Sequence, residues 1–237
     1  MEIKHKNHEK DMDVQKMREL FRSEFIQQSQ NWIKNYNRLM AYYRCAIMEI
    51  ENKFNVLNEE FSLRYDRNPI NGIHTRLKSP ESIQEKLERK ELPMTLEAIE
   101  ENLMDVAGVR VICAFPDDVY MLEDALLKQD DITLIKRKDY IANPKENGYR
   151  SLHLIVAVPI FLAKEKRMMN VEVQLRTIAM DSWASLEHQL RYKKDMPFTD
   201  VMAKDLFYCA QLSAELDAKM DALQALAKID SFERDEE

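Results

Sequence analysis

The distribution of glycine and proline constrains the fold of this chain more than any other feature. Its 237 residues include only three glycines and seven prolines, and all of them lie between Pro69 and Pro197. The first 68 residues and the last 40 therefore contain neither of the residues that interrupt helices. We expect both ends of the chain to be helical and the turns to be concentrated in the centre.

The apolar residues of both ends repeat with a helical period. Between Met40 and Phe61 the steps from one apolar residue to the next alternate between three and four, which is typical of a long amphipathic helix. This helix should include Trp32 and end near Arg67, before an Asn-Pro pair. A second apolar stripe runs from Leu206 to Ala227. Such helices can serve oligomerisation or can simply cover a sheet, and the pattern alone leaves both open.

The centre of the chain changes to shorter periods. Apolar runs that end in turn residues predict strands, and longer runs between them predict helices. Interleaved strands and helices indicate an α/β or α+β sheet flanked by the long helices. The predicted strands are Val109–Phe115, Ile132–Ile135, Leu152–Val158 and Val171–Leu175, and the predicted helices between and after them are Val119–Lys128 and Met180–Tyr192.

Composition and missing motifs exclude several classes of protein. Three glycines cannot form a P-loop or a G-x-G-x-x-G turn, and neither motif is present. No apolar run reaches the roughly 20 residues of a membrane span, and a net charge of −7 argues against general coating of nucleic acid. The chain has no H-E-x-x-H or C-x-x-C pair that would support a zinc site. Its cysteines are expected to be reduced core thiols of a cytoplasmic protein, because they are odd in number and far apart: Cys45, Cys113 and Cys209.

A basic segment from Arg76 to Lys90 is the first candidate for binding chemistry. Ser79 and Pro80 predict that a helix begins inside it, and Arg76 and Lys78 precede the N-terminus, where the helix dipole favours anions. Together these groups could hold a polyphosphate without glycines, although an ordinary solvated helix would look much the same. Three polar residues of the predicted helix recur on one face: Ser82, Lys86 and Arg89.

Two carboxylates form the second candidate. Asp105 precedes the strand that contains Arg110, and Glu172 alternates with Gln174 and Arg176 on the polar side of another strand. Two acids at such positions can converge on Mg²⁺, which commonly binds one or two carboxylates together with substrate phosphates. The alternatives are that Asp105 only stabilises a turn and that Glu172 lies on a solvated face.

The third candidate is the loop from Asp139 to His153. Its Asn147-Gly148 pair is a strong turn signal, and Tyr149 directly after it could present an aromatic face to a nucleobase. A plain hairpin with exposed polar residues is the alternative. The other groups of the loop that could bind phosphates are Lys145, Arg150 and His153.

Each segment is a weak signal alone, but their order along the chain is specific. The chain contains R-L-K-S-x-E-S-I-x-x-K-L-x-R-K, then D-V-A-G-V-R-V-I, then D-Y-I-x-x-P-K-x-N-G-Y-R-S-L-H-L, and then V-E-V-Q-L-R-T-I-A-M-D-x-W-A-S-L-E-H. From about Asn68 to Lys193 this set resembles the synthetase domain of the RelA/SpoT family, and most closely its small alarmone synthetases. No His-Asp pair of the family's hydrolase domain is present.

The resemblance implies an activity, a fold and an assembly. Family members transfer the β,γ-pyrophosphate of ATP to the 3′-hydroxyl of GDP or GTP with Mg²⁺, giving guanosine tetra- or pentaphosphate and AMP. The implied fold is a mixed, nucleotidyltransferase-like sheet with flanking helices, assembled as a homotetramer through terminal helices. It implies a helical region over 1–67, a synthetase core over 68–195, and a C-terminal helix with an acidic tail over 196–237.

For the ATP side, the resemblance assigns roles residue by residue. Arg76 and Arg110 would sandwich the adenine, since guanidinium planes stack well on purines. Asp105 would bind Mg²⁺, and Glu172 would contact the metal and draw the proton from the attacking 3′-hydroxyl. The residues matching those that hold the ATP phosphates are Lys78, Ser82, Lys86 and Arg89.

For the acceptor side, Tyr149 matches the aromatic platform under guanine. Lys145 and His153 match contacts to the acceptor phosphates, and Asp181 lies where the guanine edge is expected, although some relatives carry Asn there. Gln174 and Arg176 are assigned to the same side. A non-catalytic module of the same fold that binds nucleotide or RNA is the alternative function. The acidic balance disfavours broad RNA binding, and the presence of both acids disfavours a degenerate binder.

Overall fold

The structure is a computed structural model that describes residues 2–65, 67–191 and 198–234. Its internal contacts divide the chain into two units, Met1–Ala41 and Tyr42–Glu237. The sheet, the helices that cover it and all candidate site residues belong to the second unit. The domain boundaries expected at 67/68 and 195/196 stay a prediction.

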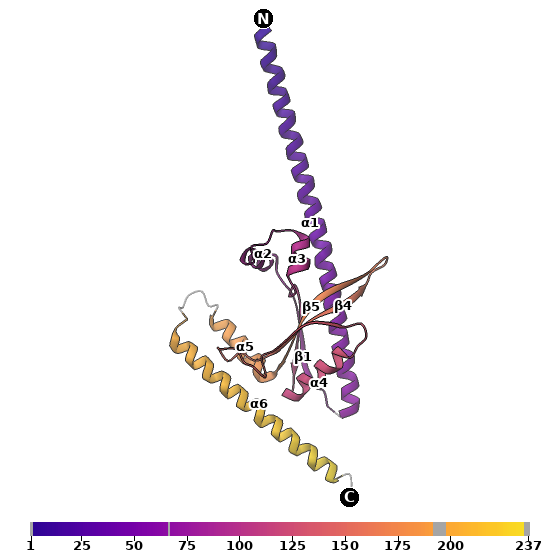
Figure 1. The fold of residues 1–237 in the computed structure, drawn as a ribbon, viewed down its shortest axis with the longest axis vertical. Coiled ribbons are helices and arrows are strands. Elements are labelled where there is room, and N and C mark those ends of the chain that lie inside the picture. Colours follow the sequence, from indigo (N-terminus) through magenta and orange to yellow (C-terminus); the bar gives the residue numbers. More distant parts are fainter. Residues whose placement is uncertain (1, 66, 192–197, 235–237) are drawn as a thin grey trace. The chain divides into compact units, whose positions relative to one another are not determined.

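The second unit is built on one five-stranded sheet with the strand order β1-β2-β5-β4-β3 (Figure 1). The pair β2·β5 is parallel, and the pairs β1·β2, β4·β5 and β3·β4 are antiparallel. The expected mixed sheet flanked by helices is therefore confirmed. The elements are α1 (Glu2–Tyr65), β1 (Ile70–Leu77), α2 (Pro80–Arg89), α3 (Leu96–Asn102), β2 (Ala107–Cys113), α4 (Pro116–Leu127), β3 (Thr133–Asp139), β4 (Leu152–Phe161), β5 (Lys166–Thr177), α5 (Ile178–Arg191) and α6 (Asp200–Arg234).

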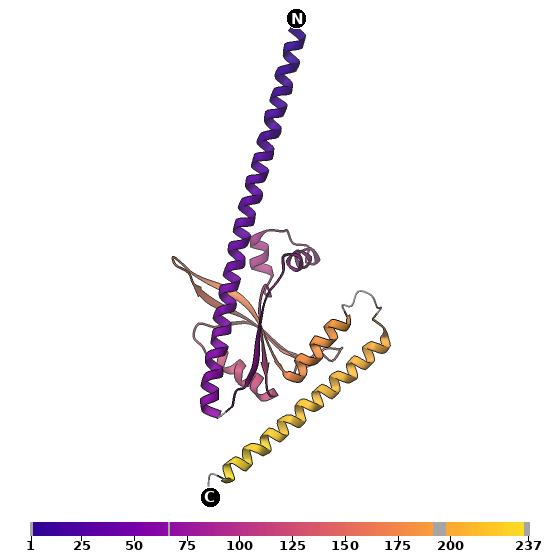
Figure 2. The same ribbon diagram turned by 180° about the vertical axis from the view of Figure 1, so that it is seen from behind.

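The sheet has one apolar and one polar face, because its central strands alternate. On β2, β5 and β4 every second side chain is buried, as Val109, Val173 and Leu154 illustrate. The C-terminal part of α1 and helix α4 run along the apolar face (Figures 1 and 2). The apolar stripe predicted for α1 is buried from Tyr43 to Phe61, at 7% exposure or less. The polar face is left for the candidate site.

Several element boundaries differ from those predicted. Helix α1 begins at Glu2, within the helical region expected over 1–67, because nothing in this glycine-free segment stops it. Strand β1 was not predicted: a register irregularity between Ile70 and Gly72 breaks its alternation. Strand β4 continues through Pro159, where a strand end was expected. The proline is tolerated because β3 pairs only as far as Ala157, so β4 is an edge strand from there on.

Helix α6 does not turn its apolar side toward the rest of its own chain, as a helix that covers a sheet would. It lies beside α5 (Figure 2) and buries Ala210 and Asp217, which are each 5% exposed. Its apolar stripe faces solvent instead: Leu216 is 50% exposed and Leu223 is 59% exposed. The stripe predicted between Leu206 and Ala227 is therefore mostly exposed up to Leu226; the side chain of Ala227 lies outside the described residues.

The burial of the cysteines differs in part from the expectation. Cys45, Cys113 and Cys209 are all free thiols. Cys113 is buried as expected, whereas Cys209 is exposed on α6, so the expectation of three core thiols was wrong for Cys209. Among the described helices, none has a segment long and apolar enough to cross a membrane.

Candidate active site

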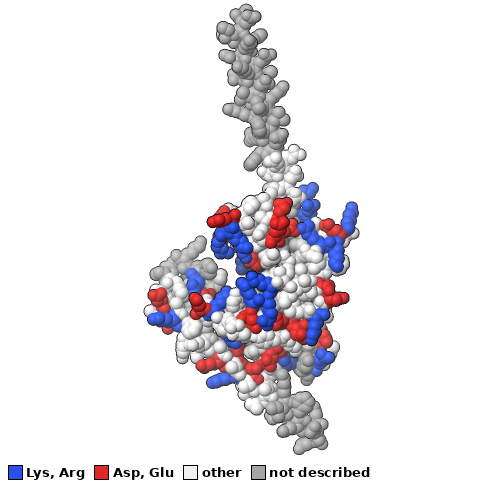
Figure 3. All heavy atoms as spheres, in the orientation of Figure 1, with Lys and Arg blue, Asp and Glu red and all other residues white. Residues whose placement is uncertain are grey.

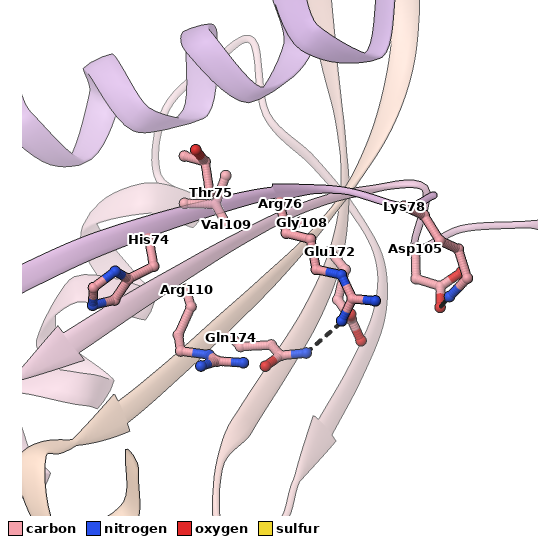
Figure 4. A pocket seen from close by; sticks show the side chains of 10 residues that line it. All are labelled: His74, Thr75, Arg76, Lys78, Asp105, Gly108, Val109, Arg110, Glu172 and Gln174. Atoms are coloured by element: carbon pink, nitrogen blue, oxygen red, sulfur yellow. Dashed lines mark hydrogen bonds and ion pairs between the residues drawn. The ribbon is translucent and has the colours of Figure 1, made fainter. Parts of the chain in front are cut away.

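The polar face of the sheet carries a pocket of about 400 Å³. Alternation along β1 puts His74 and Arg76 on this face, and β2 and β5 contribute Arg110 and Gln174 (Figure 4). Gly108 lies between Arg76 and Glu172 in the strand register, so no side chain separates these two groups. The residues that line the pocket are His74, Thr75, Arg76, Lys78, Asp105, Gly108, Val109, Arg110, Glu172 and Gln174.

An acidic group holds two lysines at one end of the pocket. Asp105 Oδ2 accepts hydrogen bonds from Lys78 Nζ at 2.9 Å and from Lys86 Nζ at 2.6 Å. Burial alone would raise the pKa of the Asp105 carboxyl, but the two lysines outweigh it and the pKa is lowered. Lys86 reaches this point from α2, which begins as predicted with a side-chain cap by Ser79 and with Pro80 in its first turn.

The other oxygen of Asp105 meets the requirement for a cation ligand. Asp105 Oδ1 is buried and has no hydrogen-bond partner among the described residues. Glu172 lines the same pocket. Within the described residues no group of three or more His, Cys, Asp or Glu side chains could hold a metal ion. Two carboxylates do suit Mg²⁺, which completes its octahedron with water and substrate phosphates.

Glu172 is held at both carboxylate oxygens. His153 Nδ1 lies 3.2 Å from Oε1, and Gln174 Nε2 donates to Oε2 at 3.0 Å. Burial alone would raise the pKa of this carboxyl, yet the hydrogen bonds from His153 and Gln174 lower it overall. Glu172 is therefore an ionised carboxylate with a fixed orientation at neutral pH.

The loop before β4 presents Tyr149 next to this carboxylate. Gly148 adopts φ +85° at the turn, and the backbone N–H of Gly148 donates to the carbonyl of Lys145 at 2.8 Å. This turn brings Lys145 Nζ to 4.7 Å from the ring centroids of both Tyr149 and Tyr140. A cation therefore occupies the aromatic face on which a base could stack.

Asp181 bridges two arginines, Arg110 on β2 and Arg176 on β5. Its Oδ1 accepts from Arg110 Nη1 at 3.3 Å and from Arg176 Nη1 at 3.2 Å. Burial lowers the pKa of Arg110, and the nearby charge of Arg176 lowers it further, so a shared carboxylate between the two guanidinium groups is electrostatically favourable. Asp181 is in the first turn of α5, where the helix dipole favours an acidic residue.

Positive charge on this side of the molecule is local. Figure 3 shows Lys and Arg side chains gathered over α2 and the adjoining part of the sheet, while acidic side chains dominate lower on the same face. A chain with a net charge of −7 thus still offers a cationic site for a polyanion.

Comparison with known proteins identifies the family. The model described as "Region found in RelA / SpoT proteins" matches residues 75–197, which is more than half of the chain. The chain belongs to the RelA/SpoT family. Among curated proteins, it is similar to the GTP pyrophosphokinase YwaC of Bacillus subtilis, with 39% identity over 188 residues, or 79% of this chain and 90% of that protein.

Solved structures agree with this assignment to the RelA/SpoT family. The fold is similar to small alarmone synthetase 1 from Bacillus subtilis, solved bound to its product pppGpp, with a TM-score of 0.74 and 34% identity. That match covers 81% of this chain and 97% of the other. Small alarmone synthetase 2 from the same organism matches with a TM-score of 0.73 and 37% identity, covering 80% and 98%. The resemblance to small alarmone synthetases is therefore confirmed.

Most of the residues predicted from the RelA/SpoT motifs gather around the pocket. Six of them line the pocket together: Arg76, Lys78, Asp105, Arg110, Glu172 and Gln174. Five others are linked to these by hydrogen bonds, directly or through one another: Lys86, His153, Tyr149, Arg176 and Asp181. Lys145 covers Tyr149, as described above.

Two predicted phosphate ligands are not brought into the pocket. The Ser82 hydroxyl accepts a hydrogen bond from Ser79 Oγ at the start of α2, and Arg89 is exposed in the last turn of that helix. Sequence reasoning missed His74, which lines the pocket beside Arg110 in the strand register. The period-two spacing of His74, Arg76 and Lys78 could have revealed it, had this segment been treated as a strand.

Proposed function

We propose that this chain transfers the β,γ-pyrophosphate of ATP to the 3′-hydroxyl of GDP or GTP, producing ppGpp or pppGpp and AMP. The observation that carries the proposal is the meeting of cationic side chains with two carboxylates, Asp105 and Glu172, around one pocket. Its curated relatives are GTP pyrophosphokinases, and one structural neighbour was solved with pppGpp. Its three free thiols are consistent with the reducing environment of the cytoplasm, where we propose that it acts.

On the donor side, cations neutralise and orient the polyphosphate. Arg76 and Arg110 come from neighbouring strands to the same face, where their guanidinium planes can stack on the two sides of adenine. Lys78 and Lys86 are already gathered at Asp105 and can turn to the phosphates. Positioning and charge neutralisation supply most of the catalysis in phosphoryl transfer, so these groups need no covalent role.

Asp105 and Glu172 would hold the Mg²⁺ that this chemistry requires. The buried, unpartnered Oδ1 of Asp105 supports this assignment. A bound Mg²⁺ would supply charge neutralisation at the transferred phosphates.

On the acceptor side, Glu172 acts as general base for the 3′-hydroxyl, since it is ionised and has a fixed orientation. Tyr149 stacks on guanine after Lys145 leaves its ring and moves to the acceptor phosphates. The carboxylate of Asp181 can accept from guanine N1–H and N2–H. Tyr149→Ala is expected to raise the KM for the acceptor while the KM for ATP is kept; Tyr120→Ala, outside the pocket, is the control.

The proposal is tested by incubating the purified chain with ATP, GDP and Mg²⁺ and separating the nucleotides by anion exchange. AMP and guanosine tetraphosphate are expected in equal amounts. Glu172→Gln should abolish synthesis and keep ATP binding, while Glu101→Gln, an exposed acid on α3, should keep both. Full turnover by Glu172→Gln would refute the base assignment. Binding of nucleotide or RNA without AMP from any acceptor would favour the non-catalytic module.

We further propose that the chain forms a homotetramer through its terminal helices. Support comes from α6, whose apolar side chains face solvent within one chain, and from the apolar groove of about 650 Å³ between α5 and α6. Leu216→Asp, at 50% exposure, should reduce the mass measured by light scattering without loss of helix signal. Lys219→Asp, an exposed substitution on the same helix, is the control. An unchanged mass for Leu216→Asp would refute this interface.

A further inference from the structure

Five side chains of the polar face form a closed ring of hydrogen bonds. Arg176 Nη2 donates to Tyr149 Oη at 2.5 Å, and Tyr149 Oη lies 2.8 Å from His153 Nε2. His153 Nδ1 lies 3.2 Å from Glu172 Oε1. The second path runs from Arg176 Nη2 to Gln174 Oε1 at 3.0 Å, and from Gln174 Nε2 to Glu172 Oε2 at 3.0 Å. Both paths begin at Arg176 and end at Glu172.

The chemistry of the donors fixes the direction of each path. A guanidinium group can only donate, so the Tyr149 oxygen accepts from Arg176 and its own proton points to His153. His153 Nε2 must then accept, which leaves the imidazole proton on Nδ1, directed at Glu172. A proton on Nε2 would instead set two donors against the Tyr149 oxygen and leave the hydroxyl proton without this acceptor. The amide orientation of Gln174 is fixed by the same reasoning.

The ring is built on rigid and largely buried elements. His153 on β4 pairs with Gln174 on β5, and Glu172 and Arg176 flank Gln174 on the same side of that strand. Arg176 is 5% exposed, and its Nε donates to Ser151 Oγ at 3.3 Å. The side chain of His153 is 14% exposed. Little solvent can compete for these hydrogen bonds, and the strands set the positions of all members except Tyr149, which lies in the loop before β4.

We propose that His153 and the hydroxyl of Tyr149 are positioning residues that aim the Glu172 carboxylate at the acceptor hydroxyl. This inference rests on the proposed function, in which Glu172 is the base. It differs from the roles in acceptor binding that the family resemblance assigns to the Tyr149 ring and to His153. A role in binding acts on the KM of GDP, whereas a role in aiming the base acts on kcat.

Tyr149→Phe separates these roles because it removes the hydroxyl and keeps the ring. We expect kcat to fall about 10- to 100-fold, the cost typical of losing a group that orients a functional residue, with the KM of GDP unchanged. Tyr120→Phe loses a tyrosine hydroxyl that is bonded to Asp139 on the other side of the sheet, and should keep kcat. A changed KM with unchanged kcat in Tyr149→Phe would overturn the inference.

A pair of variants at His153 tests the imidazole. His153→Ala removes both nitrogens, whereas the side-chain amide of His153→Asn can occupy the place of Nδ1 and still donate to Glu172. Partial recovery of kcat in His153→Asn relative to His153→Ala is expected. Equal kcat values in the two variants would contradict the aiming role.

One readout does not depend on turnover. Nitrogen NMR of the ¹⁵N-histidine-labelled wild-type chain should give an Nδ1–H signature for His153, assigned by its loss in His153→Asn, and Tyr149→Phe should disturb it. An Nε2–H signature in an active enzyme would overturn this inference alone. A wild-type chain that makes no AMP would instead overturn the proposed function, whatever the tautomer of His153. The role of Glu172 as general base would then be refuted as well.

Discussion

Gly148→Ala is the substitution whose effect the structure defines most sharply. A Cβ added at this position would lie 2.5 Å from the Cβ of Ala210 on α6 and 3.4 Å from the ring of Phe207. The backbone φ of +85° adds a conformational cost. Left-handed backbone costs an ordinary residue about 1–2 kcal/mol, and overpacking a filled site costs about 1–3 kcal/mol. We therefore expect Gly148→Ala to lower the free energy of unfolding by about 2–5 kcal/mol.

A double-mutant cycle in urea denaturation separates the two costs. Ala210→Gly removes the Cβ with which the side chain added by Gly148→Ala would clash. On its own it should lower the free energy of unfolding by about 1 kcal/mol, because glycine is unfavourable inside a helix. Combined with Gly148→Ala, it should relieve the steric part and leave the backbone part, so the pair is less destabilised than the sum. Strictly additive effects would refute the contact with Ala210. A Gly148→Ala chain as stable as wild type would refute the whole argument.

The same substitution has a functional consequence. Gly148 directly precedes Tyr149, and its turn is closed by the hydrogen bond to the Lys145 carbonyl. Any shift of this loop away from α6 moves the aromatic platform proposed for guanine. We expect the KM for GDP to rise in Gly148→Ala and to recover in the double variant, while the KM for ATP stays constant.

The remaining predictions concern three carboxylates. Asp105→Asn should raise the Mg²⁺ concentration for half-maximal activity about 10- to 100-fold, measured by metal titration; an unchanged titration would contradict the ligand assignment. Asp181→Asn should raise the KM for GDP about tenfold, as expected for the loss of one hydrogen bond to a charged group, and should also loosen Arg110. Burial alone would raise the pKa of Asp139, but backbone N–H groups and Arg137 lower it overall. Its contribution to stability is therefore full above about pH 4, the ordinary carboxyl pKa, and is lost as the pH falls further. Asp139→Asn should accordingly destabilise the chain at pH 7 by about 1 kcal/mol and have no effect near pH 2; a difference independent of pH would refute this.

Much of the fold follows from periodicity in the sequence. The stripe from Tyr43 to Phe61 predicts the buried face of α1, and strict alternation around Glu172 predicts the two faces of β5. Strand β1 could not be predicted in the same way, because its bulge interrupts the alternation and three consecutive residues, His74, Thr75 and Arg76, are all polar and exposed. The orientation of α6 could not be predicted either, since an apolar stripe does not reveal whether it faces its own chain or another.

Most residues of the pocket could be predicted from the sequence, but their arrangement could not. The motif order identifies the groups, and alternation puts Glu172 and Gln174 on one face. The meeting of Asp105 with Lys86 depends on where α2 lies relative to the start of β2, which no local pattern encodes. The exposed position of Arg89 has the same origin: it shares a face with Lys86 on a helical wheel, yet lies beyond the reach of the pocket.

The scarcity of glycine affects which ion pairs the site residues form when no substrate is bound. Phosphate loops rich in glycine offer backbone N–H groups that are fixed before the ligand arrives. The phosphate ligands proposed here are side chains, and a partly buried cation without a partner is costly. Lys78 and Lys86 are therefore held by Asp105, and Arg110 is held by Asp181. Substrate binding must exchange these ion pairs for new ones rather than add to them. Asp181 Oδ1 accepts from both Arg110 and Arg176, so ATP that engaged Arg110 would leave the Asp181 carboxylate paired with Arg176. Under the proposed function, the donor and acceptor sites would therefore share one charged cluster, formed by Arg110, Asp181 and Arg176.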